Sequence, residues 1–94
     1  MAVRVKFTGS FRCLSGKNML ELRLGGSSPL RDVVKMIVEE LPKLEPALID
    51  PEFENPKTNL LIIVNGKEMS VLDRFETIIE DGDEVVFVPI VHGG

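Results

Sequence analysis

Hydrophobic and polar residues alternate in two segments near the start of the chain. The hydrophobic positions are Val3, Val5 and Phe7 in the first segment and Leu20, Leu22 and Leu24 in the second. Because successive side chains of a strand point to opposite faces, each segment is predicted to be a β-strand with one buried face. A cluster of turn-forming residues at 15–18 separates the two segments, so they are predicted to pair as a hairpin.

Residues 29–41 show a helical spacing of hydrophobic positions instead. These positions are Leu30, Val33, Val34, Ile37, Val38 and Leu41. They fall on one side of a helix, and the side chains predicted to pack on the sheet are Leu30, Val34, Ile37, Val38 and Leu41. Ser28 is predicted as the N-cap and Pro29 as the first helical residue, while Pro42 ends the helix.

The second half of the chain begins with a segment of different character. Residues 43–59 contain prolines at positions 46, 51 and 56 with acidic residues between them. This composition is typical of a surface loop, with one helical turn predicted at 47–50. The stretch LLIIVNGKEM then predicts a buried strand at 60–64, a tight turn at Asn65-Gly66 and a short return strand. A turn at Asp81-Gly82 precedes the final strand, which is predicted at 84–91.

The predicted order of elements is strand, strand, helix and then a series of strands. A single amphipathic helix buries its hydrophobic stripe against one face of a sheet. The predicted fold class is therefore α+β, with one mixed sheet packed on one main helix, which is the β-grasp or ubiquitin-like fold. The final strand is the most hydrophobic and is predicted to be central in the sheet.

Within the final strand, a period of two separates the side chains into two sets. Val85 and Phe87 belong to one face, and Phe87, as the larger side chain, is predicted to pack on the helix. Val86 and Val88 belong to the other face, where exposed hydrophobic area is predicted to bind a partner protein. The alternative is that the loop at 43–59 covers this face.

Length, composition and charge limit the classes of protein to which this chain can belong. A chain of 94 residues is expected to form a single domain, residues 1–94. Its net charge of −4, with scattered Lys and Arg, argues against direct binding of nucleic acid. The hydrophobic runs are far shorter than the ~18 residues that span a bilayer, and the start MAVRVKF lacks the hydrophobic core of a signal peptide. We therefore expect a cytoplasmic protein that does not bind membranes.

The residues that commonly carry catalysis or bind metals are scarce. One cysteine, Cys13, and one histidine, His92, cannot form a disulfide or supply the ligands of a structural zinc site. The alternating acids at 50, 52 and 54 lack the glycine and the final glutamate of a calcium loop. A nucleophilic pair of Cys13 and His92 is conceivable, but a lone cysteine is more often an inert packing residue. No metal or cofactor is expected to bind this chain.

The C-terminal tail, residues 89–94, has the sequence PIVHGG. A frayed terminus is the simplest interpretation of two final glycines, but here they follow directly on a hydrophobic strand. Glycine lacks a Cβ, so such a tail can pass in extended form through a narrow channel of a partner. We therefore expect Gly93 and Gly94 to be functional.

Three segments of the chain resemble one superfamily of small proteins. VRVKFTGSFRCLSG resembles the opening of the MoaD and ThiS sulfur carriers, IIVNGKE resembles their strand and turn, and EDGDEVVFVPIVHGG is similar to their ending. The final His-Gly-Gly and the proline-rich loop also resemble the ubiquitin-related modifier that thiolates tRNA, and small archaeal modifier proteins share the pattern. Ile90 and His92 differ from the second proline and the small residue that are common in MoaD, so the branch stays open.

The resemblance implies a carrier or non-catalytic subunit that acts with partner enzymes. In this superfamily a ubiquitin-activating-type enzyme uses ATP to adenylate the C-terminal carboxylate. The resemblance thus implies that Gly94 is the reactive residue and that Gly93 helps the tail to thread into the enzyme. A sulfur donor then converts the adenylate to a thiocarboxylate, or a thiol and then a lysine amine convert it to an isopeptide. The residues expected to contact partners are Val86, Val88, Ile90, Val91 and His92. His92 is expected to be an exposed spacer rather than a base.

Three functions from different classes stay open at this point. The first is a sulfur carrier that delivers sulfur to molybdopterin, thiamine or tRNA, with the large subunit of molybdopterin synthase as one candidate partner. The second is a covalent modifier joined to lysines of target proteins, and one protein can combine both roles. The third is a non-reactive β-grasp interaction module that merely ends in glycines.

Overall fold

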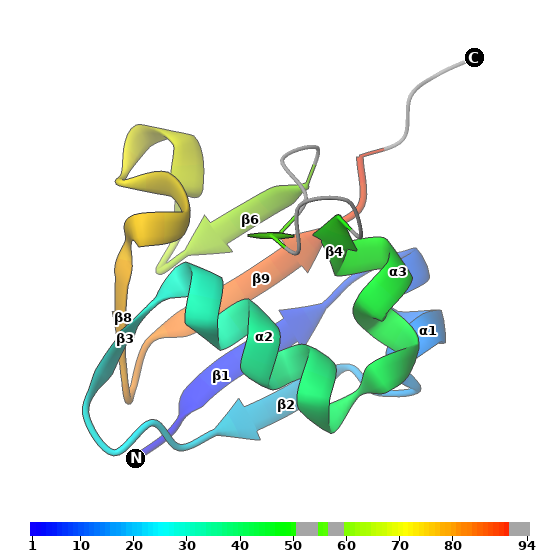
Figure 1. Ribbon diagram of the computed structural model, residues 1–94, viewed down its shortest axis with the longest axis horizontal. Coiled ribbons are helices and arrows are strands. Elements are labelled where there is room, and N and C mark those ends of the chain that lie inside the picture. The colour runs from blue at the N-terminus through cyan, green and yellow to red at the C-terminus, as the bar shows by residue number, and fades with distance from the viewer. Residues whose placement is uncertain (51–54, 57–59, 91–94) are drawn as a thin grey trace.

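The computed structural model describes residues 1–50, 55–56 and 60–90. Its main sheet has the strand order β2-β1-β9-β6-β7 (Figure 1). These strands are β1 (Val3–Phe7), β2 (Met19–Leu22), β6 (Leu61–Val64), β7 (Lys67–Glu68) and β9 (Glu84–Val88). β1 and β9 are parallel, and the other neighbouring strands are antiparallel. The mixed sheet and the central position of β9 agree with the predicted β-grasp.

Helix α2 (Leu30–Glu40) covers one face of this sheet (Figure 1). Its completely buried side chains are Leu30, Val33, Val34 and Ile37. Val38 and Leu41 are only partly buried against the core, so the predicted packing face is confirmed, with less burial in its last turn than expected. From the sheet, Val85 and Phe87 are both completely buried, as the period of the strand predicts. None of the helices in the described residues has the length and hydrophobicity needed to cross a membrane.

The start of α2 differs from the prediction. Ser28 and Pro29 belong to β3 (Ser27–Pro29), which pairs antiparallel with β8 (Ile78–Glu80). The first helical residue is Leu30, whose N–H donates to the backbone carbonyl just before β8 at 2.8 Å. No side chain caps the helix. The predicted N-cap and first helical residue are therefore wrong, because this segment is extended and pairs with β8.

Between β1 and β2 the chain forms a short helix, α1 (Ser10–Ser15), where the sequence predicted only a turn. Glycines with positive φ flank it, Gly9 at 55° and Gly16 at 71°. Phe11 is its buried residue, and the ring packs edge-on against Phe87 with the ring centroids 6.3 Å apart. A helix this short with a single buried residue shows no hydrophobic period, so the pattern could not reveal it.

The connection that follows α2 packs on the helix side of the sheet. It contains η1 (Pro42–Leu44), α3 (Glu45–Leu48) and the paired strands β4 (Ile49–Asp50) and β5 (Asn55–Pro56). Leu44 and Leu48 are completely buried, and α2 contacts η1, α3 and β5. The described part of this connection therefore does not cover the opposite face of the sheet. The helical turn predicted at 47–50 is found slightly earlier, in α3.

Two turns meet at the start of β9. Asn65 and Gly66 form the predicted tight turn, with positive φ of 49° and 83°. The Asn65 side chain donates to the Asp83 carboxylate at 3.1 Å and accepts from the Glu84 N–H at 2.9 Å. The turn after β6 is thereby bound to the turn before β9. Short 3-10 helices, η2 (Met69–Val71) and η3 (Arg74–Glu76), connect β7 to β8.

Asp81 connects the end of β2 to the turn before β9. Its carboxylate accepts the backbone N–H groups of Leu24 at 2.8 Å and Gly25 at 3.0 Å. The hydrogen bond from Leu24 is the main cause that lowers the pKa of the Asp81 carboxyl below its usual value. The predicted second strand, which extended to Leu24, ends at Leu22 because this backbone turns toward Asp81.

Candidate functional site

The C-terminal tail follows the central strand of the sheet. β9 lies between β1 and β6, and the chain leaves it through Pro89 and Ile90 (Figure 1). The strand ends at Val88 rather than continuing to residue 91 as predicted, since proline has no N–H to donate to a ladder. Ile90 is 45% exposed and accessible to a partner. The remaining predicted site residues, Val91, His92, Gly93 and Gly94, lie outside the described residues.

The base of the tail is anchored in the core by Phe87. This side chain is completely buried, and its ring stacks on that of Phe7 with centroids 6.1 Å apart. Phe11 of α1 contacts the same ring from another direction. Rings from β1 and α1 therefore pack on the ring of β9 just before Pro89, so the tail begins beside the packed core.

The face of the sheet opposite α2 carries a group of aliphatic side chains, which we call the aliphatic patch. It consists of Leu61 and Ile63 of β6 and Val86 and Val88 of β9. In the antiparallel pairing, Leu61 lies opposite Val88 and Ile63 lies opposite Val86. Directly opposed residues point to the same face, and all of these side chains are only half-buried. The patch therefore leads along β9 to the point where the tail begins.

Sequence reasoning identified only half of this patch. The period of two in the last strand revealed Val86 and Val88, but Leu61 and Ile63 belong to a run of hydrophobic residues without alternation. Combining the predicted strands at 60–64 and 84–91 as antiparallel neighbours would have found them, because register determines which side chains are opposed.

An ion pair borders the aliphatic patch on the same face. Lys6 Nζ lies 2.9 Å from Glu84 Oε2, and Lys6 is the register partner of Val86 in the β1–β9 pair. The hydrogen bond from Lys6, followed by its positive charge, lowers the pKa of the Glu84 carboxyl. The carboxylate is therefore ionised at neutral pH. An exposed pair of this kind contributes little to stability, but it places both signs of charge beside the hydrophobic surface.

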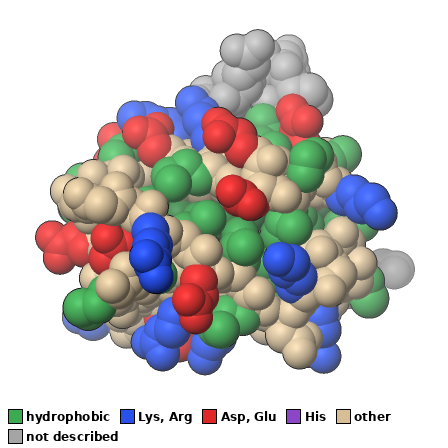
Figure 2. Space-filling view, turned by 90° about the horizontal axis from the view of Figure 1, so that it is seen from below, with side chains coloured by type: hydrophobic (Ala, Val, Ile, Leu, Met, Phe, Trp, Pro, Cys, Tyr) green, Lys and Arg blue, Asp and Glu red, His purple; other side chains and the backbone are tan. Residues whose placement is uncertain are grey.

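Figure 2 shows the molecule from below the view of Figure 1. Acidic and basic side chains are mixed on this face around a central group of hydrophobic side chains. The described residues on this face therefore form no extended basic surface of the kind that nucleic acids bind.

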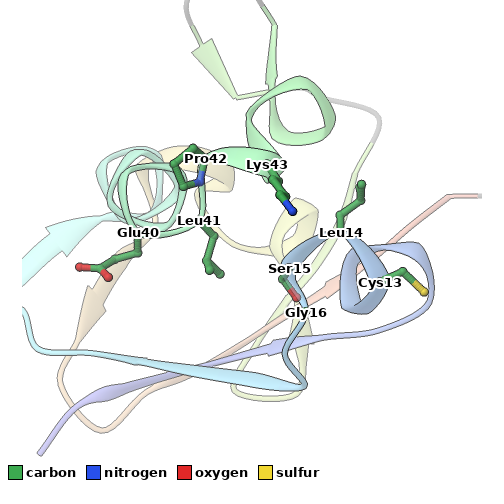
Figure 3. Close-up of a pocket in the computed structure, with 8 residues that line it drawn as sticks. All are labelled: Cys13, Leu14, Ser15, Gly16, Glu40, Leu41, Pro42 and Lys43. Atoms are coloured by element: carbon green, nitrogen blue, oxygen red, sulfur yellow. The ribbon is translucent and has the colours of Figure 1, made fainter.

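Cys13 lies in α1 and is exposed. It belongs to the wall of an open pocket of about 290 Å³ between α1 and the junction of α2 with η1. In Figure 3 its sulfur points away from Leu41 and Lys43, and Glu40 also points away from it. Because His92 lies outside the described residues, the pairing of Cys13 with His92 stays a hypothesis. The described residues contain no group of three or more His, Cys, Asp or Glu that could hold a metal ion.

The chain is similar to known proteins over its whole length. A family model described as the ThiS family matches residues 5–94. Small archaeal modifier protein 3 of Haloferax volcanii is 31% identical over 94 residues, covering 100% of both chains. Ubiquitin-related modifier 1 of Schizosaccharomyces pombe is 31% identical over 99 residues, again covering 100% of both chains.

Solved structures share the fold. SAMP1 from Haloferax volcanii matches with a TM-score of 0.86 over 100% of both chains, at an identity of 18% that supports the fold alone. Small archaeal modifier protein 1 from Methanosarcina acetivorans is 26% identical, with a TM-score of 0.82 over 99% of this chain and 96% of that one. A Pyrococcus furiosus protein described as a putative molybdopterin converting factor, subunit 1, is 25% identical, with a TM-score of 0.73 over 97% and 99%. The ubiquitin-like β-grasp is thereby confirmed.

Proposed function

The chain belongs to the ThiS family of ubiquitin-like carriers and modifiers, and we propose that it is a sulfur carrier activated at the carboxylate of Gly94. The observation that carries this proposal is the extent of the family match. It runs through β9 and the tail to residue 94, so it includes the two glycines that the chemistry requires. We further propose that the chain itself is not a catalyst and that its partners supply ATP and sulfur.

Activation would begin with the Gly94 carboxylate, since a free carboxylate is an anion at neutral pH and a poor electrophile. One of its oxygens attacks the α-phosphorus of ATP on a ubiquitin-activating-type enzyme, and pyrophosphate leaves. A persulfide sulfur then attacks the acyl carbon of the adenylate, and AMP leaves. A second thiol breaks the resulting acyl disulfide, which leaves a thiocarboxylate on Gly94 and a disulfide on the donor.

The described residues support the docking step of this proposal. The aliphatic patch offers hydrophobic area that a partner can cover, and its members Val86 and Val88 precede the tail directly. Ile90 extends the hydrophobic surface beyond the strand. We propose that an activating enzyme binds this surface, with Val91 and His92 as tail residues that pass into its channel. Gly93 and Gly94, without a Cβ, would let the backbone approach the nucleotide closely.

The names of the relatives favour a second candidate function. Both sequence relatives described above are called modifiers. In that role, a thiol and then a lysine amine would attack the activated Gly94 carbonyl, and the product would be an isopeptide bond to a target protein. The Pyrococcus furiosus protein supports a narrower alternative, in which the large subunit of molybdopterin synthase receives the tail.

We expect the chain to consume no ATP alone and to be modified only with the adenylating enzyme of the same organism. Adding that enzyme, ATP and a persulfide donor should exchange one terminal oxygen for sulfur, because the partner supplies both the leaving group and the sulfur. Intact-mass spectrometry measures this exchange, and a reaction without ATP is the control. A branched peptide joining Gly94 to a lysine in cell extracts would favour the modifier role. If a competent enzyme formed no adenylate, the chain would be a non-reactive interaction module.

We expect that replacing Val86 and Val88 by threonine weakens binding of the activating enzyme about tenfold or more, since a partner that covers these side chains would then bury two hydroxyl groups without hydrogen bonds. Threonine has the shape and strand propensity of valine, and because both side chains are half-buried, the unfolding midpoint is measured as well to separate a loss of stability from a loss of binding. Isothermal titration calorimetry measures the Kd. The matched control is Ile78→Thr, because Ile78 is an exposed aliphatic residue of β8, outside the main sheet. Equal Kd values for the control and the double variant would show that the aliphatic patch is not the binding surface.

A further inference from the structure

Thr8, the residue after β1, binds the carbonyl group of Phe87 in β9 twice. Its backbone N–H donates to the Phe87 oxygen at 3.2 Å, and its hydroxyl donates to the same oxygen at 2.9 Å. Phe87 is the buried anchor of β9 and lies just before the residues that leave the sheet. One residue from the start of the chain therefore holds the base of the tail.

Gly9 makes a second contact with the base of the tail. Its backbone has φ of 55° and ψ of −133°, a conformation that side chains disfavour. A Cβ at this position would lie only 2.8 Å from Cγ and 3.3 Å from Cδ of Pro89. The pyrrolidine ring thus rests directly on the Gly9 backbone, and no larger residue would leave room for it.

These contacts determine the direction in which the chain leaves the sheet. Proline restricts its own φ to a narrow range around −65°. With the Phe87 carbonyl bound by Thr8 and the Pro89 ring resting on Gly9, the backbone on both sides of Val88 is held. Ile90 and the residues after it therefore start from a defined position. We call Thr8 and Gly9 the tail clamp.

We propose that the tail clamp consists of positioning residues that direct the Gly94 carboxylate to the nucleotide of the activating enzyme. This inference rests on the proposed function. Residues 90–94, when extended, reach about 16 Å, so a small change of direction at Pro89 displaces the carboxylate by several times the length of a bond. A misplacement of about 1 Å at a reacting group can cost on the order of a hundredfold in rate. The clamp acts through the tail and contacts neither ATP nor the reacting atoms.

The decisive comparison is between Gly9→Ala and Gly16→Ala. Both glycines flank α1 with positive φ, but a Cβ at Gly16 meets no atom within 4 Å. Both variants therefore carry backbone strain, and only Gly9→Ala displaces Pro89. In steady-state pyrophosphate exchange with the adenylating enzyme, Gly9→Ala should lower kcat by a factor on the order of ten to a hundred, with KM for the carrier nearly unchanged. Gly16→Ala should leave both constants close to those of the unaltered chain.

A second pair of variants tests the clamp without altering a glycine, in case Gly9→Ala does not fold. Thr8→Val removes the hydroxyl that binds the Phe87 oxygen but preserves the shape of the side chain. Thr8→Ser restores a hydroxyl at the same place. We expect Thr8→Val to lower kcat severalfold, the size of effect expected when one hydrogen bond is lost, and Thr8→Ser to recover most of it.

A third variant separates the effect of the contact between position 9 and Pro89 from the effect of backbone strain at position 9. Pro89→Ala removes the Cγ and Cδ atoms that a Cβ at position 9 would meet. If the clamp acts through this contact, Gly9→Ala should lower kcat less in the Pro89→Ala background than in the unaltered chain. Equal losses in the two backgrounds would mean that Gly9 does not act through Pro89.

The outcomes distinguish this inference from the proposed function. If the unaltered chain is adenylated but Gly9→Ala behaves like Gly16→Ala and Thr8→Val behaves like Thr8→Ser, the clamp has no positioning role and the proposed function stands. A loss confined to KM would assign these residues to docking and also overturn the inference. If the unaltered chain is never adenylated by a competent enzyme, the proposed function fails first, and the clamp fails with it.

Discussion

Replacing Ile37 by alanine is expected to destabilise the fold by about 2–5 kcal/mol. Ile37 lies in the middle of α2 with its side chain completely buried against the sheet. Removing its outer carbon atoms leaves a cavity beneath the helix, and the small gain in helix propensity from alanine, at most about 0.7 kcal/mol, cannot offset that loss. Urea unfolding followed by circular dichroism measures the change as a lower midpoint.

Lys35→Ala is the matched control for this experiment. Lys35 belongs to the same helix but is exposed, so its replacement should change the free energy of unfolding by no more than about 0.5 kcal/mol. The contrast between the two variants tests which side of α2 faces the core. Equal midpoints for Ile37→Ala and the unaltered chain would mean that the core face of α2 has been assigned wrongly.

The elements that the sequence predicted correctly are those that contact the core at regular intervals along the chain. α2 contacts the sheet over several turns, so its hydrophobic positions recur with a helical spacing. β1 and β9 each bury one face, and their side chains alternate accordingly, with Phe87 inside as predicted. The turn at Asn65 and Gly66 was predictable because its positive φ requires those residue types. Local chemistry and tertiary structure agree in all of these segments.

The elements that the sequence did not predict depend on contacts between distant segments. Ser28 and Pro29 are typical of a helix start, but pairing with β8, about 50 residues later, makes them extended. α1 buries a single phenylalanine, which creates no period. In both places the local pattern is compatible with several structures, and the partner segment decides between them.

Contacts between distant segments also explain why the sequence predicted only part of the candidate site. Val86 and Val88 were predicted to face outward from the alternation in one strand, whereas Leu61 and Ile63 required the register of two. Thr8 contacts Phe87, a residue 79 positions later, and nothing in the sequence near Thr8 indicates that contact. The tail was proposed as a site because its glycines and its place after a hydrophobic strand are local features of the sequence, and both its role and its chemistry stay predictions.

Deleting Gly93 and Gly94 should abolish activation and leave the fold nearly intact. The deleted residues come after the end of β9 in the sequence, and terminal residues beyond a strand usually contribute little to stability, so we expect the unfolding midpoint to change little. The shortened chain would end in His92, and its carboxylate would lie about two residues, or roughly 7 Å, short of the nucleotide. Its imidazole would also bring bulk to the place where glycine passes. Pyrophosphate exchange with the activating enzyme measures the loss.

A double replacement, Gly93→Ala with Gly94→Ala, separates the effect of tail length from the effect of side-chain size. It preserves the length of the tail and adds only two methyl groups. If reach is what matters, this variant should keep part of the activity that the deletion loses. The deleted chain should still compete with the unaltered chain for the enzyme, since the aliphatic patch that we propose for docking is unchanged. A deleted chain that formed adenylate or thiocarboxylate at an undiminished rate would refute the proposal, because the reaction would then not depend on the carboxylate of Gly94.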